Sequence, residues 1–139
     1  MANVVEKNIV RMVAIRLGPD EDLLRGILNA CRQYGIKDAV LLSCIGSLKH
    51  VNVYNSVPVG VDGDDIIYGY APEARAWGDL QGVMEMCSVK GLIHFDENGE
   101  VNGDLFITFS NAAGTVLGGR LGEGTLVKLT SEIVIGELA

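Results

Sequence analysis

The order of secondary structure is decided within residues 18–45, which read GPDEDLLRGILNACRQYGIKDAVLLSCI. Pro19 and the three acidic residues after it favour a helix start, because proline suits the first turn and carboxylates suit the positive end of the helix dipole. Gly35 is a typical helix end. From residue 39 the period changes to a continuous apolar run, AVLLSCI, which is typical of a central strand. Helical spacing relates the apolar residues between these points: Leu23, Leu24, Ile27, Leu28, Cys31 and Tyr34.

The rest of the chain is dominated by strand patterns. Gly46-Ser47 is expected to break the first apolar run, and PVGVDGDD at residues 58–65 is the clearest predicted loop, with a second irregular stretch at 69–78. Asn98-Gly99 predicts a two-residue hairpin turn. One helix and hairpin-connected strands predict an α+β fold with a largely antiparallel sheet of six to seven strands. The strands are expected at residues 9–17, 39–45, 48–54, 83–95, 101–109, 115–121 and 126–135.

The composition sets limits on what the protein does. The chain has 139 residues with 11 basic and 18 acidic side chains, a formal charge of −7, and no basic stripe, so direct nucleic-acid binding is not expected. Charges interrupt every apolar run before it could span a membrane, and no apolar segment of signal-peptide type follows the N-terminus. We therefore expect a single cytoplasmic domain over residues 1–139, without a membrane partner. Its mean hydropathy of +0.28 suggests apolar surface that is covered by another copy of the chain.

The cysteines do not predict a disulfide or metal site. The chain has three cysteines, Cys31, Cys44 and Cys87. An odd number of thiols is a poor disulfide framework, and no two of them have the C-x-x-C spacing. All three are therefore interpreted as small buried apolar side chains.

Few residues suggest chemistry. His94, beside Asp96-Glu97, could be an acid–base group or a hydrogen-bonded structural histidine, and His50 is interpreted as a histidine on a strand. Gly118-Gly119-Arg120 has two interpretations. The glycines allow close backbone approach and the guanidinium suits a carboxylate or phosphate, or the segment is a bulge with an ion-paired arginine.

The order of motifs over residues 8–137 resembles the PPC domain, a family named for its occurrence in plants and prokaryotes. The resemblance implies an α+β fold with one main helix, assembled as a homotrimer. In plants this domain follows an AT-hook that contacts DNA, but no Arg-Gly-Arg-Pro hook is present here. The motifs that carry the resemblance are RLG at 16–18 with EDL at 21–23, IGSL at 45–48, Glu85 with SVKG at 88–91, VLGGRL at 116–121, GTLV at 124–127 and TSEIVI at 130–135.

The resemblance also bears on metal binding. Many prokaryotic members have a His-x-His pair and a third His directly after Gly-Gly, and these positions fall on Asp104, Phe106 and Arg120. Phenylalanine cannot ligate a metal and arginine is a permanent cation. The zinc-type three-histidine site of the relatives is therefore expected to be lost, with no cofactor in its place. The same corner would hold Asp104 and Arg120, either as an ion pair or as an anion pocket.

Three functions follow as hypotheses. The first is a trimer that binds a small anionic metabolite at subunit boundaries, near the Gly118-Gly119-Arg120 turn. Arg120 would be the anion clamp, with Ser47, His94 and Asp104 as supporting polar groups. Catalysis would require His94 and Asp104 to converge with Arg120. The alternatives are a DNA-associated regulatory or protein-interaction module, by analogy with the AT-hook proteins, and an assembly scaffold without a ligand.

Overall fold

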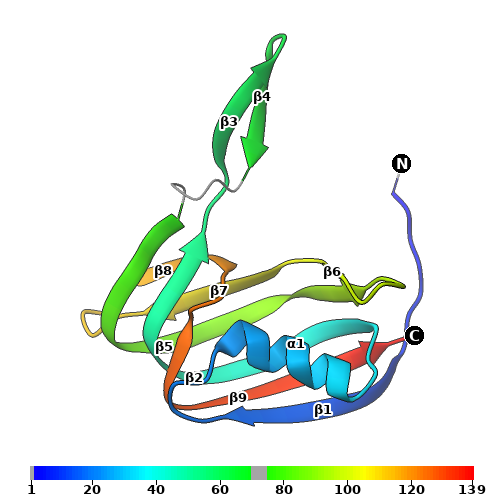
Figure 1. Ribbon diagram of the computed structural model, residues 1–139, viewed down its shortest axis with the longest axis horizontal. Coiled ribbons are helices and arrows are strands. Elements are labelled where there is room, and N and C mark those ends of the chain that lie inside the picture. Colours follow the sequence, from blue (N-terminus) through cyan, green and yellow to red (C-terminus); the bar gives the residue numbers. More distant parts are fainter. Residues whose placement is uncertain (1, 70–74) are drawn as a thin grey trace.

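The computed structural model describes residues 2–69 and 75–139, and it shows an α+β fold (Figure 1). Seven strands form one sheet in the order β1-β9-β2-β8-β7-β5-β6, and every pairing in it is antiparallel. The predicted fold class and single main helix are confirmed for the described residues. The elements are β1 (Ile9–Leu17), α1 (Leu23–Gln33), β2 (Asp38–Tyr54), β3 (Val57–Asp62), β4 (Asp65–Gly69), β5 (Arg75–Phe95), β6 (Val101–Asn102), β7 (Leu105–Ser110), β8 (Val116–Leu121) and β9 (Leu126–Leu138).

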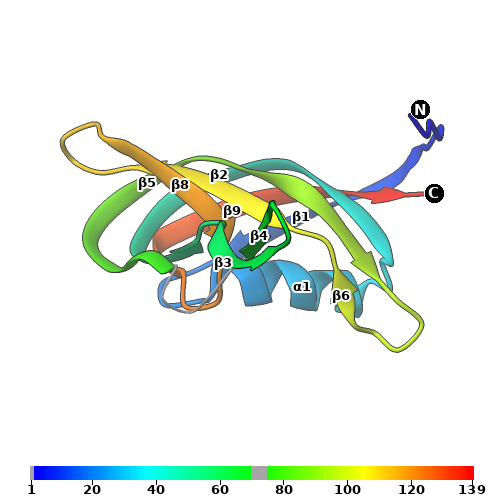
Figure 2. The ribbon, with the colours of Figure 1, turned by 90° about the horizontal axis from the view of Figure 1, so that it is seen from above.

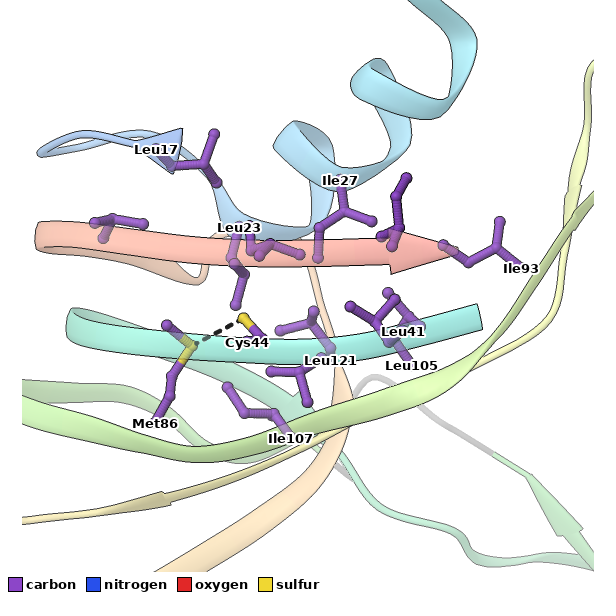
Figure 3. Packing of buried hydrophobic residues seen from close by; sticks show 14 of the residues in the cluster. Leu17, Leu23, Ile27, Leu41, Cys44, Met86, Ile93, Leu105, Ile107 and Leu121 are labelled. Carbon is purple, nitrogen blue, oxygen red and sulfur yellow. Dashed lines mark hydrogen bonds between the residues drawn. The ribbon is translucent and has the colours of Figure 1, made fainter. Parts of the chain in front are cut away.

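Helix α1 covers one face of the sheet and leaves the opposite face bare (Figure 2). It begins at Leu23 rather than at Pro19, so Pro19 and the acidic residues precede the first turn instead of lying in it. Asp22 is the N-cap, and its carboxylate accepts a hydrogen bond from the Arg25 backbone N–H at 3.0 Å. The apolar side chains of Leu23, Ile27 and Cys31 are fully buried. Figure 3 shows Leu23 and Ile27 meeting the buried side chains of the sheet. Because α1 packs on one side of the sheet, it leaves the opposite face uncovered.

Strand β2 is the central element, and the predicted break at Gly46-Ser47 is wrong. The strand runs over 17 residues and pairs with β5 and β9, and its last two residues also pair with β8. Gly46 adopts φ +143°, and a Cβ there would lie 2.2 Å from the Thr130 carbonyl oxygen of β9. The glycine thus lets the strand continue through a register shift that a larger residue would prevent.

The predicted loop at residues 58–65 is also wrong. Strands β3 and β4 form a two-stranded hairpin here, which projects from the body of the molecule (Figure 1). β-Branched and aromatic residues such as Val61, Ile66 and Tyr68 favour strands strongly enough to outweigh the neighbouring glycines and acids. In the predicted irregular stretch at 69–78, Gly69 ends β4 and Arg75 begins β5, and residues 70–74 lie outside the described residues.

The hairpin at Asn98-Gly99 is confirmed, but its turn contains three residues rather than two. The Asp96 N–H donates to the Glu100 carbonyl at 2.9 Å, and Gly99 has φ +78°. The strand expected at 101–109 is divided into β6 and β7, since Gly103-Asp104 interrupts it.

The cysteines divide into two buried thiols and one exposed thiol. Cys31 and Cys44 are buried as predicted, whereas Cys87 is exposed, so that part of the prediction is wrong. Met84 and Met86 are buried, so strand alternation places Cys87 on the opposite, exposed side, with Val83 and Glu85. The Cys44 thiol lies 3.7 Å from the Met86 sulfur (Figure 3). Burial raises the pKa of Cys44 to about 11, although a hydrogen bond with Ser131 lowers it in part.

Candidate functional site

The corner predicted from the sequence is built by strands β7 and β8. Arg120 lies opposite Phe106 in the antiparallel pair, and Asp104 directly precedes β7. The Arg120 guanidinium reaches back to the Asp104 carboxylate, with an Nη2–Oδ1 distance of 2.5 Å. Both side chains are partly exposed, Arg120 to 37% and Asp104 to 42%. The structure thus brings these two site residues into direct contact at the surface.

The glycines before Arg120 allow strands to approach one another closely. A Cβ at Gly118 would lie 2.7 Å from the Ile107 carbonyl oxygen of β7, and one at Gly119 would lie 3.0 Å from the Tyr54 carbonyl oxygen of β2. Both positions therefore require glycine for packing within the chain. The predicted close backbone approach is present, and the approaching atoms belong to the protein itself.

A small cavity lies beside this corner. Its volume is about 220 Å³, and among the described residues Arg120 is the charged one in its lining. The other residues come from α1 and strands β5 to β8 or the segments between them: Leu24, Leu28, Ile93, Val101, Gly103, Leu105 and Leu121. A cavity with aliphatic side chains, polar atoms and one cationic group is suited to a ligand that carries both an apolar part and an anionic group.

The other two predicted site residues have different partners. His94 Nδ1 lies 2.7 Å from the Asp38 carboxylate, so this histidine joins the ends of β5 and β2. Ser47 is buried, and its hydroxyl accepts a hydrogen bond from the Leu129 N–H at 3.3 Å. Sequence reasoning did not find Asp38, because a partner 56 residues away gives no local pattern.

Buried polar residues beside the β8–β9 loop were also missed. Thr125 is fully buried, and its hydroxyl accepts from the Asn52 N–H at 3.0 Å. The Asn52 amide donates to the Glu123 carbonyl, while its Oδ1 is buried without a hydrogen-bond partner among the described residues. These contacts attach the loop after Arg120 to strand β2, and they explain why the end of β8 is held in place.

The residues at the metal positions of relatives do not fit a divalent cation. Phe106 offers no donor atom, and Arg120 places a positive charge beside the single carboxylate of Asp104. Over residues 2–69 and 75–139, no group of three or more His, Cys, Asp or Glu side chains is arranged to hold a metal. Helix α1 has only 11 residues, and the described part of the chain contains no helix that could cross a membrane.

Solved structures share this fold. A plant- and prokaryote-conserved protein from Pyrococcus horikoshii is 24% identical with a TM-score of 0.69, and the match covers 99% of this chain and 85% of that one. A metal-containing protein from Archaeoglobus fulgidus is 19% identical with a TM-score of 0.70, covering 99% and 86%. A candidate DNA-binding protein from Bacteroides thetaiotaomicron is 16% identical with a TM-score of 0.68, covering 94% and 80%.

No curated protein matches the sequence. The family model of the Plants and Prokaryotes Conserved (PCC) domain matches residues 4–139, which is nearly the whole chain. This is the family that the order of motifs suggested, and the sheet with one helix agrees with it. The chain therefore belongs to the Plants and Prokaryotes Conserved domain family.

Proposed function

We propose that this PCC-domain protein binds a small anionic metabolite at the corner formed by Asp104 and Arg120. The observation that carries the proposal is the position of the Arg120 guanidinium, which contacts a carboxylate and also lines a cavity of about 220 Å³. The contact with Asp104 shows that this guanidinium binds a carboxylate. A guanidinium has five N–H donors and can serve a second carboxylate, or a ligand carboxylate can replace Asp104.

The cavity sets the size and polarity of the ligand. At roughly 30 Å³ per water molecule, its volume corresponds to about seven waters, which is below the range of drug-sized sites. The aliphatic side chains in its lining suit a short apolar tail. The proposed ligand class is therefore a small carboxylate with a short aliphatic or aromatic tail. That Ser47 and His94 support the bound anion as polar groups remains a prediction.

We include the homotrimer in the proposal. The face of the sheet opposite α1 exposes large apolar side chains, including Ile45 at 58%, Leu92 at 59% and Phe106 at 40%. Exposed apolar area of this kind is typical of a surface covered by another subunit.

Titration calorimetry with a panel of carboxylates and phosphates tests the ligand proposal. Arg120→Gln is expected to weaken binding of a carboxylate hit at least tenfold, whereas Asp104→Asn is expected to keep or strengthen it, because a competing negative charge is removed. Arg25→Gln is the matched control, since Arg25 forms an exposed ion pair with Glu123. If Arg120→Gln binds every hit as tightly as the parent protein, the clamp assignment is wrong.

A DNA-associated role is the second candidate, because one similar structure is a candidate DNA-binding protein. The charges of this chain argue against direct contact with phosphates. Among the described residues, Arg11, Arg16, Arg25, Lys49 and Arg120 already form ion pairs with carboxylates. Fluorescence anisotropy across salt concentrations separates the candidates, since phosphate contacts weaken steeply with salt. Absence of binding at low salt would exclude direct DNA recognition.

A further inference from the structure

The β3–β4 hairpin has one apolar side that its own chain does not cover. The register pairs Val61 with Ile66 and Pro58 with Tyr68, so these four side chains share one side of the hairpin. Val61 is 70% exposed, Ile66 54% and Tyr68 60%. A two-stranded hairpin has no core of its own and is marginally stable in water. We call residues 57–69 the arm, and its apolar side is a surface without a partner in the same chain.

The tip of the arm is acidic. Asp62 and Asp65 form the last pair of the hairpin, and Asp64 lies in the turn between them. All three aspartates are exposed. They lie within seven residues, along the chain, of the four apolar residues of the arm. A partner surface for the arm therefore needs an apolar area next to a positive charge.

The same chain offers such a surface on the face of the sheet that α1 leaves uncovered (Figure 2). We call this the bare face, and it exposes Leu42 and Ile45 of β2 and Leu92 of β5. A groove of about 270 Å³ runs between β2 and β5, and exposed Lys90 is the charged residue in its lining among those that the structure describes. Lys90 forms no ion pair with the described residues, so its ammonium is available to a carboxylate.

The arm is shorter than the bare face is wide. Strand β3 has six residues, which at ~3.3 Å per residue gives an arm of about 20 Å. The seven strands of the sheet have six spacings of ~4.8 Å each, which give a width of about 29 Å. An arm lying across the bare face would therefore reach over several strands, including β2 and β5 with their groove.

We propose that the arm of one copy docks on the bare face of a second copy, with its acidic tip at Lys90. The contact joins two different surfaces, so it is head-to-tail, and copies related by three-fold rotation would close into a ring. The proposal rests on the homotrimer proposed above and assigns the segments that would form its interface. It also explains why a chain with a net charge of −7 associates with itself, since the local charges at the contact are opposite.

Light scattering after size exclusion, at a fixed protein concentration, tests the docking with two variants. The arm variant is Val61→Asp with Ile66→Asp, and the face variant is Ile45→Asp with Leu92→Asp. All four side chains are at least half exposed, so circular dichroism is expected to show a native fold in both. Each variant alone is expected to have one third of the mass of the parent protein. A 1:1 mixture is expected to form a heterodimer, because the arm variant keeps an intact face and the face variant keeps an intact arm.

Ile67→Asp is the matched control, since Ile67 lies on the other side of the same hairpin and is 46% exposed. This variant is expected to keep the parent mass. An arm variant that keeps the parent mass while the face variant dissociates would overturn the docking and leave the trimer in place. Two monomeric variants that do not combine on mixing would also overturn it. A monomeric parent protein would overturn the homotrimer itself.

Discussion

Replacing Gly91 by alanine is expected to destabilise the protein strongly, because strand β7 occupies the space that a side chain would need. Gly91 has φ +145°, and a Cβ there would lie 2.0 Å from the Asp104 carbonyl oxygen. A strained conformation of this kind costs about 1–3 kcal/mol in a non-glycine residue. Relief of the overlap adds about 1–3 kcal/mol. Together these contributions lower the expected free energy of unfolding by about 2–6 kcal/mol, a large part of the roughly 5–15 kcal/mol typical of a domain.

Gly99→Ala separates the two contributions. Gly99 also has a positive φ, +78°, but nothing lies within 4 Å of the Cβ position. This control is expected to lose only about 1–2 kcal/mol. Urea unfolding followed by circular dichroism, at one protein concentration, measures both variants. If Gly91→Ala and Gly99→Ala lose the same free energy, the close approach of β5 and β7 beside Asp104 is refuted.

Three further outcomes are expected. Asp22→Ala is expected to lower the free energy of unfolding by about 1–3 kcal/mol, because the Asp22 carboxylate accepts hydrogen bonds from the Arg25 N–H in the first turn of α1 and from the Gly124 N–H in the β8–β9 loop. Urea titration measures this loss, and an unchanged midpoint would contradict it. A thiol reagent at pH 8 is expected to label Cys87 rapidly and Cys31 and Cys44 only on unfolding, and three equal rates would contradict the burial. Burial raises the pKa of both Cys31 and Cys44 from 9.0 to about 11, so between these pH values the two thiols ionise only in the unfolded state. The free energy of unfolding is therefore expected to fall as the pH rises from 9 to 11, by about 2–3 kcal/mol per thiol. Unfolding measured against pH checks this, and a variant with both Cys31→Ala and Cys44→Ala is expected to lose most of the pH dependence.

Elemental analysis of the purified protein checks the expected loss of the metal site. We expect no stoichiometric zinc or iron, because Arg120 and Phe106 replace ligating side chains at the positions identified from the family resemblance. Stoichiometric metal that survives dialysis against a chelator would contradict this expectation.

The amino-acid sequence determined most of the local structure. The helix was predictable because its apolar spacing and its stop lie close together in the sequence. Its start was not, since Pro19, Asp20 and Glu21 precede the helix and only Asp22 caps it. The contact between Asp104 and Arg120 was open to prediction because family motifs align both positions. The loop predicted at 58–65 is wrong, because the β-branched residues beside its glycines and aspartates favour strands more strongly.

Only the tertiary structure decided which distant residues meet and which surfaces stay uncovered. Asp38 reaches His94 because antiparallel pairing of β2 and β5 places residues 56 apart side by side, and no local pattern encodes that register. Cys87 is exposed because it alternates with buried Met86 on β5, and only the assembled sheet shows which side of that strand faces the core. The apolar face left open by α1 follows from the ratio of one short helix to a seven-stranded sheet, which becomes visible only when the strands are assembled.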